Sequence, residues 1–128
     1  MIEKCAAIIF CNRRLLVVRK RGTSVFISPG GKLGPSETQE ECLIREIKEE
    51  LNVGVFRMSF FDTFERPSAF EKSGVRIHSW FVEIRGVCIA SAEIEEIQWI
   101  SGSSKLAVGS VFSECVIPRL VLLGLLDA

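Results

Sequence analysis

The stretch from Pro29 to Val53 limits what this chain can fold into more than any other part of it. It begins Pro-Gly-Gly-Lys-Leu-Gly-Pro-Ser-Glu and continues as a segment with the apolar periodicity of a helix. Gly30 and Gly31 permit a sharp turn and a close approach of the backbone to another group. A lone Gly-Gly pair is weak support for phosphate binding, so the helix that follows has to carry the argument.

The predicted helix has an apolar and an acidic arc next to each other on a helical wheel. Ser36, with Gln39 three residues later, has the spacing of a capping box and predicts that the helix begins just before Glu37. In order around the wheel, the apolar residues are Leu43, Ile47, Leu51 and Ile44, and the acidic residues are Glu50, Glu46 and Glu49. The apolar arc would pack on a sheet, and the carboxylates would stand along its margin, partly shielded from water.

Three carboxylates on one helix margin suggest a site for a divalent cation. Without a cation they repel one another, by roughly 1–4 kcal/mol for each pair about 4 Å apart. Carboxylate oxygens suit Mg²⁺, with Mn²⁺ as the alternative, because these ions keep bound waters and accept substrate phosphates as further ligands. The competing interpretation is a solvated helix face stabilised by Glu–Lys pairs.

The spacing of these residues resembles the Nudix box, the signature of the Nudix hydrolases, which cleave a nucleoside diphosphate linked to another moiety. The matching residues are Gly31, Glu37 and the segment Arg45-Glu46-Ile47-x-Glu49-Glu50-x-x-Val53. By residue usage, such a pattern occurs by chance about once in a million chains of this size. The family has Gly where this chain has Asn52, and Asn is the next best residue for a left-handed helix end.

The resemblance implies a role for each residue of the box. Glu46, Glu49 and Glu50 match the metal ligands, and the carbonyl of Gly31 is often a further ligand. Glu37 and Arg45 are expected to have structural or orienting roles, with Arg45 positioning the carboxylates. The catalytic residues predicted on this basis are Glu49, Glu50, Arg45 and Glu96.

Glu96 is included among the predicted catalytic residues because many family members have a Glu shortly before an aromatic residue, in a loop that supplies a further ligand or the general base. Glu93, Glu95 and Glu96 are the candidates, and Glu96 is preferred because it lies three residues before Trp99. Basic residues near the glycine-rich turn are the candidates for contacts to the substrate phosphates. They are Arg19, Arg21 and Lys32, with Lys20 beside them.

The remaining segments predict strands and one more helix. Residues 4–10 and 15–19 are expected to form a hairpin, 25–27 a short strand, 53–65 a long strand, 69–74 a turn and 75–85 the returning strand. A final helix from about Glu114 to Leu125 would be capped by Ser113 and would bury Val116, Leu120 and Leu123. This order predicts an α/β fold, a Nudix-type α/β/α sandwich with a mixed β-sheet, as a single domain over residues 1–128.

Composition excludes several classes of function. The 128 residues contain 16 Lys and Arg against 16 Asp and Glu, with no basic block, so bulk nucleic-acid binding by charge is not expected. The N-terminus does not resemble a signal peptide, and residues 116–126 are too short to span a bilayer. Five widely spread cysteines fit a reduced, cytoplasmic protein. Cys42 and His78 are expected to be packing residues and not ligands or catalysts.

The sequence therefore predicts a Mg²⁺-dependent, MutT-like pyrophosphohydrolase that acts on nucleoside di- or triphosphates. Pro67 is placed as in ADP-ribose pyrophosphatases, which leaves that activity as an alternative. Ser113 stands where enzymes that recognise oxidised guanine tend to have Asn, which weakens that particular assignment. A nucleotide-binding module without activity is the rival from another class. Family members are often dimers, so a homodimer is one expected assembly.

Overall fold

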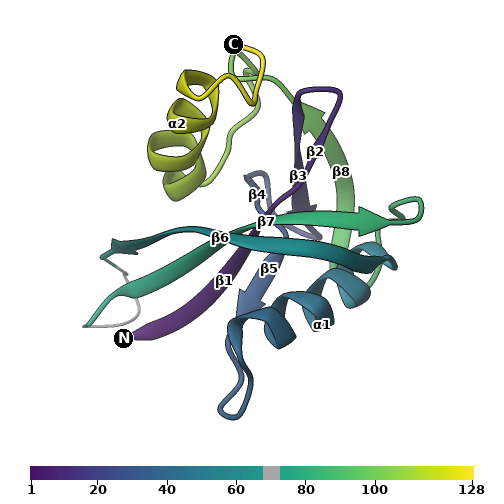
Figure 1. Ribbon diagram of the computed structural model, residues 1–128, viewed down its shortest axis with the longest axis vertical. Coiled ribbons are helices and arrows are strands. Elements are labelled where there is room, and N and C mark those ends of the chain that lie inside the picture. Colours follow the sequence, from purple (N-terminus) through teal and green to yellow (C-terminus); the bar gives the residue numbers. More distant parts are fainter. Residues whose placement is uncertain (68–72) are drawn as a thin grey trace.

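Four strands form a mixed sheet that carries most of the fold (Figure 1). The structure is a computed structural model that describes residues 1–67 and 73–128. In spatial order the strands are β5 (Gly30–Lys32), β1 (Ile2–Ile8), β7 (Val75–Arg85) and β6 (Gly54–Arg66). Strands β1 and β7 are parallel, whereas β1–β5 and β6–β7 are antiparallel. The predicted turn at 69–74 falls largely outside the described residues.

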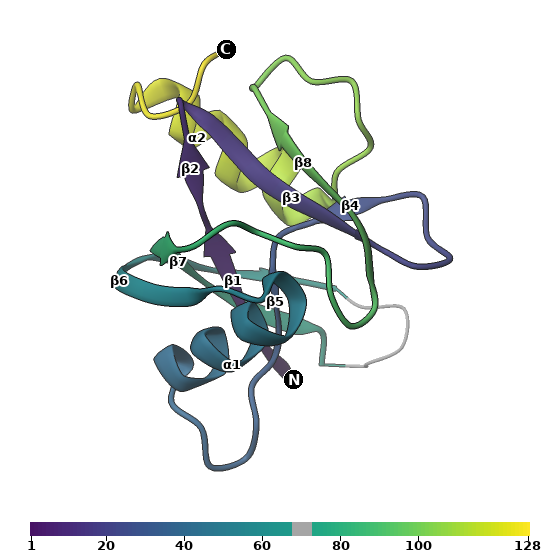
Figure 2. The ribbon, with the colours of Figure 1, turned by 90° about the vertical axis from the view of Figure 1, so that its right-hand side faces the viewer.

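A second sheet crosses the first (Figure 2). It consists of β2 (Phe10–Cys11), β3 (Arg14–Lys20), β4 (Phe26–Ile27) and β8 (Ile94–Ile100), with β8 antiparallel to β3. The hairpin predicted between residues 4–10 and 15–19 is therefore wrong for most of its length. Only β2 pairs with β3, because the chain passes from one sheet to the other after Ile8.

The helices lie on opposite sides of the strands (Figure 1). Helix α1 (Gln39–Leu51) packs on one side, and a π-helical segment η1 (Val111–Val116) continued by α2 (Ile117–Leu122) packs on the other. Strand β1 is buried on both faces, with Cys5 and Ala7 in the core under α1 and Ala6 and Ile8 in the core under α2. This burial explains its continuous apolar sequence and confirms the predicted α/β/α sandwich.

Helix α1 begins two residues later than predicted. Thr38 is the N-cap: its Oγ1 accepts the Glu41 N–H at 3.1 Å, and Glu41 Oε1 accepts the Thr38 N–H at 2.9 Å. This is a complete capping box, so Ser36 is not needed as a cap. Gln39 is bound elsewhere, because its Oε1 accepts a hydrogen bond from Trp80 Nε1 at 2.8 Å.

The apolar arc of α1 is narrower than the wheel predicted. Leu43, Ile47 and Leu51 are fully buried, but Ile44 at the edge of the arc is 49% exposed. Cys42 is buried in the same core, which fits the predicted packing role, and all five cysteines are free thiols. Asn52 ends the helix with φ 56° and ψ 37°, the left-handed conformation that the sequence predicted.

The C-terminal helix differs from its prediction at both ends. It begins with a π-helical turn at Val111, and Ser113 does not cap it. Val116 and Leu120 are buried as predicted, but Leu123 is 59% exposed. The reason is Gly124, whose φ of 76° turns the chain so that Leu126, 1% exposed, enters the core in its place.

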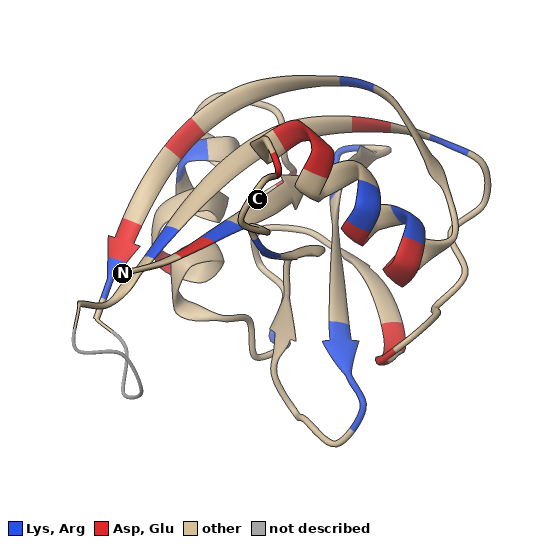
Figure 3. Ribbon diagram, turned by 90° about the horizontal axis from the view of Figure 1, so that it is seen from below, with Lys and Arg blue, Asp and Glu red and all other residues tan. Residues whose placement is uncertain are grey.

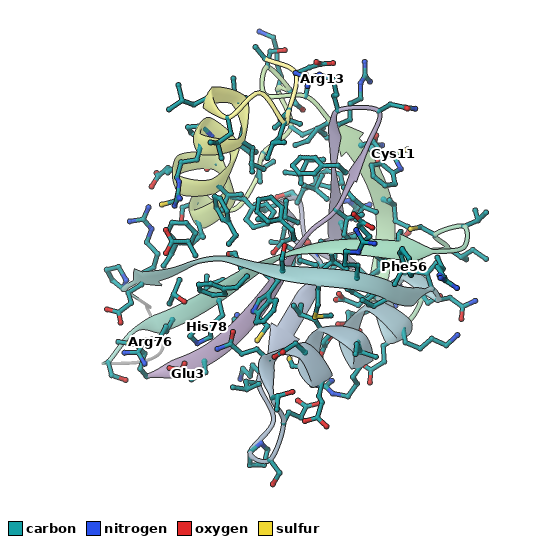
Figure 4. The ribbon with its side chains drawn as sticks, in the orientation of Figure 1. Glu3, Cys11, Arg13, Phe56, Arg76 and His78 are labelled. Atoms are coloured by element: carbon teal, nitrogen blue, oxygen red, sulfur yellow. The ribbon has the colours of Figure 1, made fainter. Side chains whose placement is uncertain are left out.

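His78 lies in a polar row across three strands (Figure 4). Its Nε2 is 2.6 Å from Glu3 Oε1 and its Nδ1 is 2.9 Å from Thr63 Oγ1. The ring is buried beside Arg76, which pairs with Glu3 at 3.2 Å. These contacts fit the predicted structural role. No helix in residues 1–67 or 73–128 is long and apolar enough to cross a membrane.

Replacing Asn52 tests the helix end. We expect Asn52→Ala to lower the free energy of unfolding by about 1 kcal/mol, because a left-handed conformation disfavours a residue with a Cβ and no local hydrogen bond. Asn52→Gly should raise it by a few tenths of a kcal/mol. Urea denaturation followed by circular dichroism measures both changes. Equal stability of all three proteins would contradict the assignment of Asn52 as a cap.

Candidate active site

The site begins where the glycine-rich turn passes over α1. Strand β5 is held against β1, with Gly30 opposite Ala6 and Gly31 opposite Cys5. Gly30 has φ 140°, and a Cβ there would lie 2.0 Å from the carbonyl oxygen of Cys5. Only glycine fits this approach. As a result, the Gly30 N–H points at α1 and donates a hydrogen bond to Glu50 Oε1 at 2.9 Å.

Gly31 brings the backbone equally close to a second carboxylate. A Cβ at position 31 would lie 2.7 Å from the carboxyl carbon of Glu46. The Glu46 side chain is only 13% exposed, and its burial raises its pKa. The turn therefore brings its backbone close to two partly or fully buried carboxylates. Carboxylate and carbonyl oxygens are the donors that hard divalent cations prefer.

Glu50 is the most informative side chain of the site. It is 1% exposed, and its Oε2 is buried with no hydrogen-bond partner among the described residues. Burial raises the pKa of Glu50 to about 7, and the charges of Glu46 and Glu93 act in the same direction. A buried carboxylate with an unpartnered oxygen is costly unless a cation or a donor satisfies it. The donor set therefore fits a divalent metal ion.

Arg45 connects the acidic residues of the helix with the loop before it. It donates to Glu37 at 2.7 and 2.9 Å and to Glu46 Oε1 at 2.7 Å, and it lies 3.7 Å from Glu49. The hydrogen bond from Arg45 lowers the pKa of Glu37 to about 2. The predicted orienting role of Arg45 fits this geometry, in which Arg45 binds the Glu46 carboxylate oxygen that lies close to Gly31.

The carboxylates are not gathered as a ready-made cage. Among the described residues, no three His, Cys, Asp or Glu side chains stand close enough together to hold an ion as they are. Glu46 is bonded to Arg45, and the Glu49 side chain is 53% exposed. In Figure 3 the acidic and basic residues of α1 lie next to one another, which is consistent with carboxylates balanced by neighbouring arginine and lysine.

The acidic segment around Glu96 is a strand and not the predicted loop. Strand β8 pairs with β3 so that Glu96 lies opposite Arg19, and the two side chains form an ion pair at 3.2 Å. Glu96 also accepts a hydrogen bond from Gln98. Glu93 precedes the strand, and its charge is the one that acts on Glu46 and Glu50. Of the three predicted candidates, Glu93 therefore lies nearest to the carboxylates of α1.

The basic residues also fall into two groups, one paired with β8 and one beside the glycine-rich turn. Arg19 and Arg21 are held by β8 and its preceding turn, Arg21 through a 3.2 Å contact with Glu95. Lys20 lines a cleft beside the turn, and Lys32 is exposed at its edge next to Lys4. The sequence could identify the basic cluster but not which members pair across the sheet.

The cleft has a volume of about 290 Å³ and opens beside Gly30 and Gly31. Its floor is the face of β1 and β7 that lies away from α1, and its wall is the start of η1. The lining is largely apolar with a few cationic side chains. It includes Gly30 and Gly31 of the turn that lies against the carboxylates of α1. A mainly apolar cleft with a few polar groups is typical of small-ligand sites.

The NUDIX domain family matches residues 1–104, which is most of the chain. The chain belongs to the Nudix family. This Nudix hydrolase is 29% identical over 112 residues to the CTP pyrophosphohydrolase of Escherichia coli, with 83% of this chain and 80% of that protein covered. It is 26% identical over 92 residues to a Bacillus subtilis protein assigned as an 8-oxo-dGTP diphosphatase, with 70% and 59% covered.

Solved structures support the same fold. The solution structure of the E. coli ORF135 protein has a TM-score of 0.81 at 24% identity and covers 95% of this chain and 90% of that one. The MutT Nudix hydrolase from Burkholderia pseudomallei has a TM-score of 0.73 at 20% identity, with 80% and 84% covered. This Nudix hydrolase is therefore MutT-like in fold, and the divalent metal typical of the family suits its carboxylates.

The buried carboxylate gives this metal-free Nudix hydrolase a pH-dependent stability. Because the pKa of Glu50 is raised from 4.5 to about 7, the folded protein keeps a proton that the unfolded chain releases, and stability falls as pH rises through that interval. We expect Glu50→Gln to remove this fall and to be more stable than the parent by about 1–3 kcal/mol near pH 8.

Urea denaturation in the presence of a chelator, repeated across this pH range, makes the measurement. Glu40→Gln is the matched control, because Glu40 is exposed on the first turn of the same helix. If the control and Glu50→Gln show the same pH dependence, the assignment of a strained, buried Glu50 is wrong.

Proposed function

We propose that this Nudix hydrolase cleaves the pyrophosphate link of a nucleoside di- or triphosphate, or of a related nucleoside diphosphate derivative, with Mg²⁺ as its cofactor. The observation that carries the proposal is the Glu50 carboxylate, which is buried with one oxygen unpartnered among the described residues and accepts a hydrogen bond from Gly30, a residue that lines a ligand-sized cleft. A protein that only bound nucleotides would have no physical need for this costly group.

Glu46, Glu49, Glu50 and the Gly31 carbonyl would hold the ion. All are hard oxygen donors, which favours Mg²⁺ and also accommodates Mn²⁺. When bound, Mg²⁺ supplies charge for the phosphoryl oxygens and the leaving phosphate and lowers the pKa of a coordinated water.

The protein's own groups have separate tasks in the proposed reaction. Arg45 fixes Glu46 in direction, as its 2.7 Å hydrogen bond supports. Glu50 or Glu93 would accept the proton of the attacking water, since both lie at the acidic centre and Glu96 is engaged by Arg19. Lys20 and Lys32 flank the turn and would balance phosphate charge.

The substrate class follows from the relatives. One is named for CTP and the other is assigned to 8-oxo-dGTP, so both act on nucleoside triphosphates. We infer that a nucleoside triphosphate yields a monophosphate and pyrophosphate here. A cytoplasmic location is part of the proposal and is supported by five free thiols. A single domain over residues 1–128 and a homodimer remain predictions.

Product analysis over a substrate panel tests this function. Purified protein with Mg²⁺ would be given the natural nucleoside triphosphates, 8-oxo-dGTP and ADP-ribose, and products would be separated by ion-exchange chromatography. Monophosphate and pyrophosphate from a triphosphate support the MutT-like reaction, whereas turnover of ADP-ribose alone would replace it. Absence of turnover on every substrate, with binding retained, would favour the inactive binding module.

Removing one proposed ligand tests the metal site. We expect Glu49→Gln to lower kcat by about 10²-fold or more, because a proposed metal ligand is lost. The fold should stay intact, because the side chain is exposed and its removal reduces like-charge repulsion. Glu40→Gln on the same helix should change kcat by less than about twofold. Turnover of Glu49→Gln within a few-fold of the parent would remove Glu49 from the ligand set.

A further inference from the structure

One lysine on the floor of the cleft has no counter-charge among residues 1–67 and 73–128. In the register of the sheet, Lys4 stands opposite Lys32 on one side and Ile77 on the other, so its side chain emerges on the cleft face between β5 and β7. In the part of the chain that the structure describes, three cationic side chains line the cleft: Lys4, Lys20 and Arg66. The Lys4 side chain is therefore a half-buried part of the cleft lining.

The other two cations have partners. Lys20 lies 3.7 Å from Glu93, and Arg66 pairs with Glu114 at 3.0 Å and donates to Cys115. Within residues 1–67 and 73–128, Lys4 has no ion pair or side-chain hydrogen bond. Burial lowers the pKa of Lys4, and the nearby charges of Lys20 and Lys32 lower it further. A half-buried ammonium in this position gains from a ligand oxygen.

The surroundings of Lys4 suit a ring better than a phosphate. Ile77, Val111 and Phe112 supply apolar surface on the floor and wall of the cleft. The phosphates are expected on the α1 side of the glycine-rich turn, where Glu46 and Glu50 lie, whereas the side chain of Lys4 is on the face of β1 away from α1. A base placed between the apolar surfaces would have its polar edge within reach of Lys4.

The cleft offers donors more readily than acceptors. Among the described residues, no Asp, Glu, Asn or Gln lines it, and its polar side chains besides the cations are the hydroxyls of Ser28 and Ser110. An ammonium group has three donors and no acceptor. It can satisfy a base carbonyl, but it leaves an exocyclic amino group without a partner.

We propose that Lys4 is a specificity-determining residue that selects nucleotides with a carbonyl where adenine and cytosine carry an amino group. The preferred bases are guanine, uracil and thymine. This inference rests on the proposed function and extends it, because it separates the two kinds of substrate for which the relatives are named. It predicts that a base with a carbonyl at this position, such as guanine, binds more tightly than cytosine.

Equilibrium binding without turnover tests this selection. Isothermal titration calorimetry in metal-free buffer would measure the Kd of GMP, UMP, AMP and CMP. The parent protein should bind GMP and UMP at least about tenfold more tightly than AMP and CMP, as expected for a hydrogen bond from a charged donor. Lys4→Met and Lys4→Gln should bring the four Kd values to within about threefold, since Gln can donate or accept.

The controls separate a base contact from a phosphate contact. Lys4→Arg should keep most of the preference, and Lys105→Met, an exposed lysine that does not line the cleft, should keep all of it. Equal weakening of all four ligands in Lys4→Gln would mean that Lys4 contacts phosphate, and the proposal would be overturned. Equal binding of the four bases by the parent protein, or no binding of any, would overturn it too. Selective binding by a protein that hydrolyses nothing would refute the proposed reaction and leave this inference standing.

Discussion

The hydrogen bond from the Gly30 amide to the buried Glu50 carboxylate is the contact on which the site depends. It fastens the glycine-rich turn to the last turns of α1, and it requires that the backbone of β5 approach β1 so closely that position 30 admits no Cβ. Through the same approach Gly31 comes close to Glu46, which Arg45 holds by a hydrogen bond. The close approach of the Gly30–Gly31 backbone thus constrains the sheet, the turn and the helix together. It also keeps two carboxylates away from water, in an arrangement that suits a cation.

Much of this arrangement could be predicted from local sequence. The box residues identified the helix, its acidic margin and the left-handed end at Asn52. The returning strand runs from Val75 to Arg85 as expected from its β-branched and aromatic residues, and it contributes to the cores on both faces of the sheet, with Val82 in one and Ile77 in the other. Patterns of this kind depend on periodicity and on the conformational preference of single residues, which act over a few positions and need no knowledge of the partner element.

The errors arose where the outcome depends on a partner distant in sequence. The start of α1 was misplaced because two overlapping capping patterns compete, and only the one at Thr38 closes both hydrogen bonds. Strand β1 was paired with its neighbour in sequence, although it lies between β5 and β7. Glu96 was preferred for its spacing from Trp99, yet the register of β8 sets it opposite Arg19. Pairing across a sheet determines these contacts, and spacing along the chain does not reveal it.

The wall of the cleft is formed by residues 109–112, which lead into η1 and form its first turn, beyond the last residue that the family matches. The glycine-rich turn and helix α1, which carries the carboxylates, lie entirely within the matched region. Substitutions in the late segment can therefore reshape the cleft without disturbing the turn and the helix that position the carboxylates. Because the cleft wall and the carboxylate site lie in separate segments, the preferred ligand can change during evolution while the carboxylate site stays the same.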